Sequence, residues 1–310
     1  MLPCRLPALL ASSVIRGSLL GESHGGLYLV DLDRGTAELK LDWNTTAIDI
    51  GGRGGDRGLR GIAFHGERIL VAANAQLLIL DRSFRVLESF SNSYLRHCHE
   101  ISVSGDRVYL TATGFDSLLS FDLTTGRFVD GWHLSQVGHS LELKHFDPSN
   151  SAGPAASHHF HLNSVHASAA GIWFGGLNTP GLLHMGGKGL SLAAQLPPGT
   201  HNAQLWNDGL LYNDTEADRV CYLRDGHITE LAVPDFDPQQ IVNLERFASA
   251  VARPRFARGL CVLANGLIAG GSSPSTISVY DLSAGRRLIQ QNLSLDVRNA
   301  VHGLAVWPYS

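Results

Sequence analysis

The stretch HNAQLWNDGLLYNDTEADRVCYL, residues 201–223, decides the fold because it reads as three short strands in a row. A large polar residue, His201, stands before a short apolar run, and the turn WNDG leads into a second run that ends in Asn213 and Asp214. Asn, Asp and Gly readily adopt the positive φ angles that two-residue hairpins require. The stretch therefore predicts an antiparallel meander.

The same pattern occurs in four other stretches of the chain. They are RGIAFHGERILVAANAQLLILD from Arg60, HEISVSGDRVYLTATGFDSLLSFDLTTGR from His99, NSVHASAAGIWFGGLNTPGLLHM from Asn163 and RGLCVLANGLIAGGSSPSTISVYDLSAGR from Arg258. In each copy a large polar residue precedes the first strand. A repeat of this kind has to be recognised first, because each unit is one element of a larger architecture.

A sixth copy is divided between the two ends of the sequence. HGLAVWP, from His302, reads as a first strand with nothing after it, and SVIRGSLLGESHGGLYLVDLDRGTAEL, from Ser13, reads as the strands that should follow. Three intervals between copies are 39, 38 and 44 residues, close to the roughly 40–45 residues of a propeller blade. We predict an all-β fold, a six-bladed β-propeller closed by pairing the C-terminal strand with the N-terminal blade.

The two remaining intervals are longer, which places insertions at about 133–162 and 234–256. Both lead into a first strand, so we expect them to form a lid or a pocket wall. The second has a helical pattern over 241–251, and the Gly-rich run 51–58 reads as a flexible loop between blades. With these insertions, residues 1–310 are predicted to form one domain.

Composition narrows the possible partners. The net charge is −4 with no run of Lys or Arg, so the basic footprint of a nucleic-acid-binding protein is missing. No apolar stretch approaches the length of a membrane span. The four cysteines are scattered, without a C-x-x-C pair, which favours a reducing compartment. We expect a cytoplasmic protein that binds neither nucleic acid nor membranes.

Aligning the six copies places one polar residue at the start of each first strand, a position that we call the slot. In blade order the slot residues are His302, Arg60, His99, Asn163, His201 and Arg258. The three histidines alternate with the other residues, at separations of 102 and 101 residues. First strands are innermost in a propeller, so we predict that His99, His201 and His302 bind a divalent metal ion. Zinc fits best, with iron or copper as alternatives.

The other slot residues suggest how a substrate is held. Arg60 and Arg258 would bind a carboxylate or phosphate of a small-molecule substrate, and Asn163 would help to position it. Glu100 follows His99 directly and is a candidate acid or base, or a partner that orients an imidazole. His161 is the first reserve metal ligand, since a shift of the alignment by two residues would place His97 or His161 in the ring, and His166 is a further candidate nearby. A fourth histidine would favour iron or copper.

Two resemblances to known proteins bear on the predicted fold and on the predicted metal site. The segments HEI, HLNSV, GTHNAQLWNDG, ARGLCV and GSSPSTI resemble blade starts in an uncharacterised propeller family known only as a domain of unknown function. That likeness spans roughly residues 55–310 and implies the fold alone. The histidine pattern is similar to that of peptidyl-hydroxyglycine amidating lyase, a six-bladed propeller whose zinc is held by three histidines. This second likeness implies that His99, His201 and His302 are ligands and that Arg60 and Arg258 orient a substrate carboxylate.

The sequence thus leads to two hypotheses of different classes. The first is a metal-dependent enzyme, a lyase or hydrolase rather than an oxidoreductase, that acts on a small anionic or polar substrate. The alternative is a non-catalytic propeller that binds or scaffolds a partner, in which the slot residues are structural. Metal content and the geometry of the slot residues separate the two.

Overall fold

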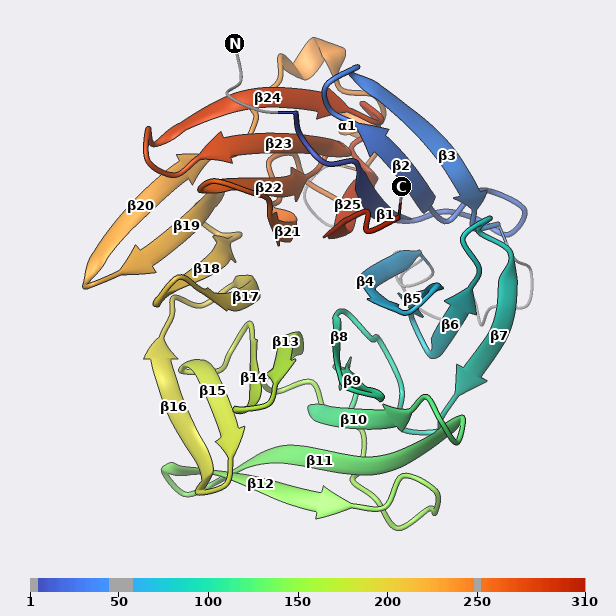
Figure 1. The fold of residues 1–310 in the computed structure, drawn as a ribbon, viewed down its shortest axis with the longest axis vertical. Coiled ribbons are helices and arrows are strands. Elements are labelled where there is room, and N and C mark those ends of the chain that lie inside the picture. The colour runs from blue at the N-terminus through green and yellow to red at the C-terminus, as the bar shows by residue number, and fades with distance from the viewer. Residues whose placement is uncertain (1–4, 45–57, 248–251, 310) are drawn as a thin grey trace. The chain divides into compact units, whose positions relative to one another are not determined.

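A computed structural model describes residues 5–44, 58–247 and 252–309. These residues form six antiparallel sheets, the blades of the predicted six-bladed β-propeller (Figure 1). The only helices among them are the 3₁₀ turn η2 (Pro238–Gln240) and the short α1 (Leu244–Phe247). The Gly-rich run predicted as a loop, 51–58, lies almost wholly outside the described residues.

The strands follow the repeat of the sequence. One blade contains β25 (Asn299–Val306), β1 (Leu9–Ile15), β2 (Gly26–Asp31) and β3 (Thr36–Asp42). The next contains β4 (Leu59–His65), β5 (Arg68–Ala73), β6 (Gln76–Leu80) and β7 (Val86–Ser91). The third contains β8 (Ile101–Ser104), β9 (Arg107–Ala112), β10 (Ser117–Asp122), β11 (Arg127–Val137) and β12 (Ser140–Phe146).

The remaining three blades have four strands each. They are β13 (Leu162–Ser168), β14 (Gly171–Gly176), β15 (Gly181–Gly186) and β16 (Gly189–Gln195); β17 (Thr200–Trp206), β18 (Gly209–Asp214), β19 (Arg219–Arg224) and β20 (His227–Ala232); and β21 (Arg258–Val262), β22 (Leu267–Ser272), β23 (Thr276–Asp281) and β24 (Arg286–Asn292). Their middle strands are buried and their last strands largely exposed.

The predicted closure is confirmed by the pairing of the two chain ends. Strand β25 pairs with β1 in antiparallel fashion, from Leu9 opposite Val306 to Ile15 opposite Asn299. The N-terminal apolar run is therefore a blade strand, as its pattern predicts. Pairing both ends in one sheet removes two unpaired strand edges.

The chain divides into two compact units, Met1–Ile62 with Leu211–Ser310, and Ala63–Leu210. We call them unit 1 and unit 2. In unit 1, an apolar core includes Leu9 and Val30 from the closing blade and Ala269 and Val279 from β22 and β23. Unit 2 has two such cores, one around Leu110 and Phe121 and another around Leu162 and Phe174. The prediction of a single domain over residues 1–310 stays a prediction.

The first insertion differs from the expected lid in its first part. Residues 133–146 form the end of β11 and the whole of β12, a fifth strand on the outer edge of its blade. Alternation in SLELKHF, with the residues of β12 alternating between exposed and partly buried, explains this outcome. Residues 147–161, which we call the strap, follow β12 and lead into β13.

Asp116 holds the strap in place. Its carboxylate is fully buried and accepts hydrogen bonds from three consecutive backbone N–H groups, of His159 (2.7 Å), Phe160 (3.1 Å) and His161 (2.8 Å), and from the Ser157 hydroxyl (2.5 Å). Tyr94 fastens the middle of the strap, because its hydroxyl donates to the Asn150 carbonyl and accepts from the Gly153 N–H. Asp116, which could have been a reactive group, is a structural anchor.

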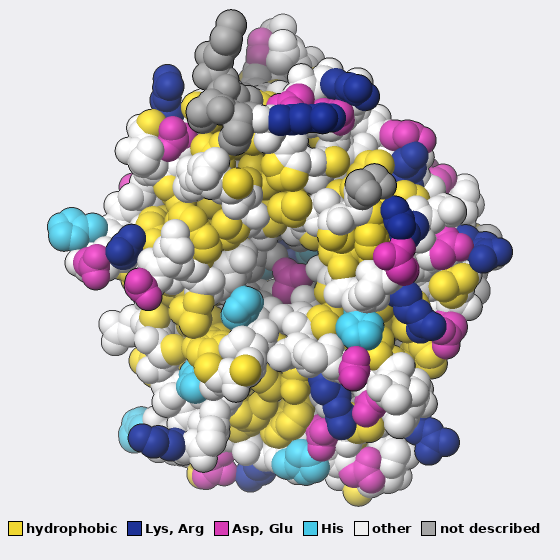
Figure 2. Space-filling view, viewed as in Figure 1, with side chains coloured by type: hydrophobic (Ala, Val, Ile, Leu, Met, Phe, Trp, Pro, Cys, Tyr) yellow, Lys and Arg dark blue, Asp and Glu magenta, His cyan; other side chains and the backbone are white. Residues whose placement is uncertain are grey.

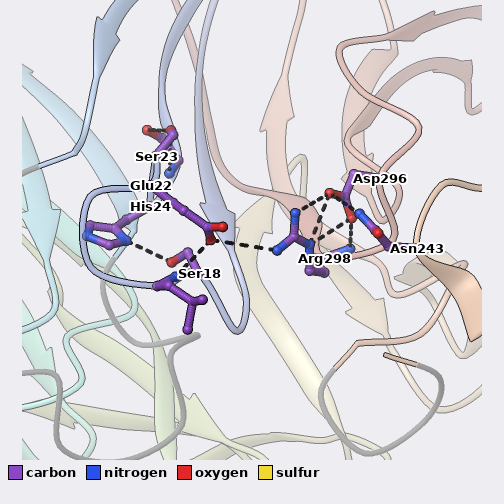
Figure 3. A network of polar contacts seen from close by, with 9 residues as sticks. Ser18, Glu22, Ser23, His24, Asn243, Asp296 and Arg298 are labelled. Carbon is purple, nitrogen blue, oxygen red and sulfur yellow. Dashed lines mark hydrogen bonds and ion pairs between the residues drawn. The ribbon is translucent and has the colours of Figure 1, made fainter. Parts of the chain in front are cut away.

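The second insertion docks on the chain that precedes β25. Val242 exchanges backbone hydrogen bonds with Leu295 and Val297. Figure 3 shows the side-chain part of this contact, in which Asp296 accepts from Asn243 (2.8 Å) and from Arg298 (2.8 Å). The helical pattern predicted over 241–251 is observed as α1, and residues 248–251 lie outside the described part.

Surface features add little to the choice of partner. On the face in Figure 2, basic and acidic side chains are interspersed. None of the described helices has the length and apolar character needed to cross a membrane.

Candidate functional site

All six slot residues are buried, although each is polar or charged. Their exposed fractions are 2% for Arg60, 9% for His99, 2% for Asn163, 2% for His201, 8% for Arg258 and 5% for His302. Each stands at or near the start of its first strand. Burial of six such residues is costly unless each is bonded, so their contacts decide what the site can do.

Irregular backbone surrounds the slots. In unit 2, the residue two positions before the slot has a positive φ in all three blades: His97 (55°), His161 (54°) and Gly199 (80°). Register shifts typical of a β-bulge lie at or next to the slots Asn163, Arg258 and His302. Just before β8, the backbone N–H groups of both His99 and Glu100 donate to the Thr111 hydroxyl at 3.0 Å. A bulge re-aims side chains that strand alternation would separate.

Both unit 2 slot histidines have their tautomer set by a backbone carbonyl. Nδ1 of His99 lies 2.7 Å from the His97 carbonyl, and Nδ1 of His201 lies 3.0 Å from the Gly199 carbonyl. A carbonyl only accepts, so Nδ1 carries the proton in each neutral ring and Nε2 has the lone pair. This is the tautomer of a histidine that uses Nε2 as a base or a ligand.

The reserve histidines divide into two kinds. The His161 ring contacts the His99 ring, with centroids 5.1 Å apart, and the His97 ring lies 5.5 Å from that of His158. His166 instead lies beside Trp173, at a centroid distance of 6.2 Å, and burial lowers its pKa. The structure therefore places His161 beside a slot and His166 away from one.

Asn163 is committed to neighbouring protein groups. Its side-chain amide donates to the Thr200 carbonyl (3.0 Å), and its amide oxygen accepts from the Ser164 hydroxyl (2.9 Å). The Ser164 hydroxyl also accepts from the Ala203 N–H at 3.2 Å. These bonds fasten β13 to β17, so a role in positioning substrate stays a prediction for Asn163.

Glu100 reaches across to a residue that sequence reasoning missed. Its carboxylate accepts from the Asn202 side-chain amide at 2.6 Å, although the two residues are 102 positions apart. Both follow a slot histidine directly. Asn202 has a φ of 53°, a conformation that costs free energy and that surrounding contacts must maintain. Burial raises the pKa of Glu100 to about 7, against the lowering effect of the Asn202 hydrogen bond.

Replacing Glu100 by Gln should make the protein more stable above neutral pH. The raised pKa means that ionising Glu100 costs more in the folded than in the unfolded chain, so wild-type stability falls as pH rises from about 4.5 to about 7. Gln keeps an acceptor for Asn202 without this cost. We expect a gain of about 1–3 kcal/mol at pH 8 and little change at pH 4.5, measured by urea unfolding.

The exposed Glu216 provides the matched control, since Glu216→Gln makes the same chemical change in a solvated position. An unchanged pH profile in Glu100→Gln would show that Glu100 titrates as an ordinary carboxyl.

Unit 1 brings two slot residues into direct contact. Nη1 of Arg258 lies 3.1 Å from Nε2 of His302. A guanidinium only donates, so His302 accepts through Nε2 and carries its proton on Nδ1. His302 therefore carries its proton on the same nitrogen as His99 and His201. Its Nε2 lone pair, however, already accepts a hydrogen bond from Arg258.

Arg258 stands in a cluster of positive charge. Burial lowers its pKa well below the usual arginine value, and repulsion from Arg16 and Arg60 adds to the effect. Its Nε is buried without a hydrogen-bond partner in the described part of the chain. The Phe256 ring lies under three guanidiniums, with Arg258 at 4.6 Å, Arg253 at 4.9 Å and Arg16 at 5.0 Å from its centroid.

The members of this cluster differ in their charge partners. Arg253 pairs with Asp218 at 2.6 Å, whereas the groups that act on the charge of Arg258 within the described part of the chain, Arg16 and Arg60, are both positive. Arg16 is held by its backbone, because its N–H donates to the carbonyl of Arg298 at 2.9 Å, the residue bonded to Asp296 in Figure 3. Arg258, Arg16, Arg60, His302 and Phe256, all in unit 1, are called the guanidinium site below.

Sequence reasoning found three members of the guanidinium site and missed Arg16 and Phe256. Phe256 stands two positions before its slot, the same place as His97 and His161, so the repeat contained a signal for it. Arg16 comes from the turn after β1, outside the aligned strands, and only the fold brings it near Arg258.

Within its described residues, the structure does not bring together a set of ligands for the predicted metal ion. In the segments 5–44, 58–247 and 252–309, no cluster of three or more His, Cys, Asp or Glu side chains has the spacing to hold a metal ion. The three-histidine centre stays a prediction.

Comparison with known proteins shows the fold alone. No protein-family model matches this chain, and no curated protein matches it. Among solved structures, a chain of a nidogen/laminin complex is 11% identical, with a TM-score of 0.58 over 96% of this chain and 97% of that one. A protein of unknown function from Bacteroides caccae is 12% identical, with a TM-score of 0.54 over 96% and 98%. At these identities the likeness supports the propeller fold and no activity.

Proposed function

We propose that this β-propeller binds a small anionic ligand, a carboxylate or phosphate compound, at the guanidinium site. The carrying observation is the buried Arg258, whose Nε has no partner among the described residues and whose charged neighbours are themselves positive. Clustered buried cations persist where an anion offsets their repulsion.

The chemistry of the site suits an oxyanion. A guanidinium presents a planar fork of donors that matches carboxylate and phosphate oxygens. Phe256 supports that fork from below, since the Arg258 guanidinium lies 4.6 Å from its ring centroid. The bond to His302 fixes Nη1 and leaves Nε for a ligand. Arg16, which is partly exposed, would make the first contact with an anion arriving from solvent.

Replacing Arg258 by Met tests the proposal. Met fills a similar volume without a charge, so the unliganded protein should be as stable as wild type or more stable. Affinity for an anion should fall at least about 30-fold, because a charge-assisted pair in a buried site is lost. Calorimetric titration with inorganic phosphate at low ionic strength measures the affinity, and thermal unfolding measures the stability.

Arg127→Met is the matched control, because Arg127 is exposed and its removal changes the net charge equally. The proposal fails if wild type binds no phosphate, sulfate or carboxylate, or if both variants lose affinity to the same extent.

A metal-dependent activity is the second candidate function, favoured by the tautomers of His99 and His201. Their Nδ1 protons are donated to carbonyls, which leaves Nε2 suited to a divalent ion such as zinc, iron or copper. A bound ion would supply the Lewis acidity of a lyase or hydrolase. His302 fits a ligand role less well, because its Nε2 accepts from Arg258.

Elemental analysis of the purified protein tests this second candidate. We expect about one equivalent of a single metal in wild type and its loss in His201→Ala, with the exposed His227→Ala unchanged. Absence of metal in wild type, even after reconstitution with zinc, iron and copper, would contradict it and leave anion binding as the function.

A further inference from the structure

Resting on the proposed function, we infer that the guanidinium site selects a doubly charged oxyanion group, such as a phosphate monoester or a dicarboxylate, over a singly charged one. The geometry points to this class because the guanidiniums of Arg258 and Arg16 lie against the same Phe256 ring, at 4.6 Å and 5.0 Å from its centroid, while His302 contributes a neutral ring that already accepts from Arg258.

Arg258 is the buried charge around which the other cations of the guanidinium site lie. Among the residues that the structure describes, the charged groups that act on it are Arg16 and Arg60, and each repels it. A ligand bound at Arg258 is therefore attracted by three cations, and this attraction grows in proportion to the ligand's own charge. Burial strengthens the effect, because Arg258 and Arg60 have exposed fractions of only 8% and 2%. The cost of desolvating a dianion opposes it, and several fixed donors are needed to offset that cost.

The donors are fixed in advance. Phe256 contacts the guanidiniums of both Arg258 and Arg16, at 4.6 Å and 5.0 Å, so the same ring positions two separate strand ends. The Arg258 guanidinium is also held by His302. Two guanidiniums held against one ring present donors from two directions, which suits an ion with oxygens on several sides better than a single planar carboxylate.

The experiment compares small anions of different charge on the full chain. Calorimetric titrations at low ionic strength use sulfate, inorganic phosphate at pH 8 and succinate as the doubly charged probes, and acetate and propionate as the singly charged ones. We expect doubly charged probes to bind at least about tenfold more tightly. Phosphate against succinate distinguishes a phosphate ligand from a dicarboxylate.

Two variants separate charge from position. Arg16→Gln should weaken the doubly charged probes by about twice the free energy that it costs acetate, and so reduce the preference, because it removes one cation whose attraction grows with the ligand's charge and leaves Arg258 in place. Phe256→Leu keeps every charge but removes the ring that contacts the guanidiniums. It should therefore weaken the binding of every probe and leave the order of their affinities unchanged. Circular dichroism and thermal unfolding confirm that each variant is folded.

Each outcome has a distinct meaning. Equal affinity for singly and doubly charged probes would overturn this inference and leave the proposed anion site intact. Binding of no probe by wild type would overturn both. A preference for doubly charged probes that persists in Arg258→Met would place the site elsewhere and overturn the inference as well.

Discussion

Asp116→Ala should cost about 4 kcal/mol of unfolding free energy, one of the two largest effects that we expect from a single substitution in this protein. The fully buried carboxylate accepts from the N–H groups of His159, Phe160 and His161 and from the Ser157 hydroxyl. Alanine leaves these donors without their acceptor, at about 1–3 kcal/mol for each that water cannot reach, which applies most clearly to the N–H of the buried Phe160. Urea unfolding measures the loss.

The part of the chain that becomes accessible to protease is as informative as the size of the stability loss. Because Asp116 holds the strap, limited proteolysis should cut Asp116→Ala within residues 147–161 before wild type is cut. Asp116→Asn keeps one acceptor oxygen and should lose about half as much stability. The exposed Asp225 provides the control through Asp225→Ala. If Asp116→Ala unfolds at the wild-type urea concentration, the strap is anchored by other contacts.

Gly303→Ala should cost at least about 3 kcal/mol, because the added methyl has no room. A Cβ at this position would lie 2.3 Å from the backbone carbonyl oxygen of Arg60, well inside contact distance. That carbonyl also accepts from the Ser12 hydroxyl, which in turn accepts from the Gly303 N–H at 2.8 Å. The substitution therefore forces β25 away from the backbone at Arg60 in β4 and displaces the Ser12 hydroxyl, which lies 2.8 Å from the added Cβ.

Gly187→Ala is the matched control, since nothing lies within 4 Å of a Cβ built there. We expect the control to unfold like wild type and Gly303→Ala to unfold at a clearly lower temperature. Wild-type stability in Gly303→Ala would mean that β25 and the chain around Arg60 approach less closely than described.

Two glycines of unit 1 stand directly after a slot, because the backbone of the next blade comes close to each of them. In unit 1, Gly259 and Gly303 follow their slots, and a Cβ on Gly259 would lie 3.3 Å from the His302 carbonyl oxygen. Each of these glycines lets the backbone at the slot of the next blade approach. Glu100 and Asn202 occupy the same position in their blades, and there two long side chains meet in a hydrogen bond. The repeat predicts where the residue after the slot lies in each blade. The type of that residue decides whether neighbouring backbones pack closely or two side chains form a hydrogen bond.

The site shows where reasoning from sequence reaches its limit. Alignment of the repeat identified the six slot residues, and the structure shows that all six are buried. It did not predict that Arg258 would donate to His302, because the direction of a side chain depends on the bulge and twist of its strand. Nor did it predict the pair of Glu100 and Asn202, because both residues lie where the backbone departs from a regular strand: Glu100 precedes β8, and Asn202 has a φ of 53°.

The sequence by itself determined the fold class of this protein, its six blades and the closure by its ends, because strand alternation and turn residues are local and recur with the repeat. Only the tertiary structure decided what the slot residues do. Arg16 and Phe256 join Arg258 from separate segments, and Asp116 fastens a strap more than 40 residues away. These contacts depend on how neighbouring blades and insertions pack, and packing between segments distant in sequence leaves no periodic signal in the chain.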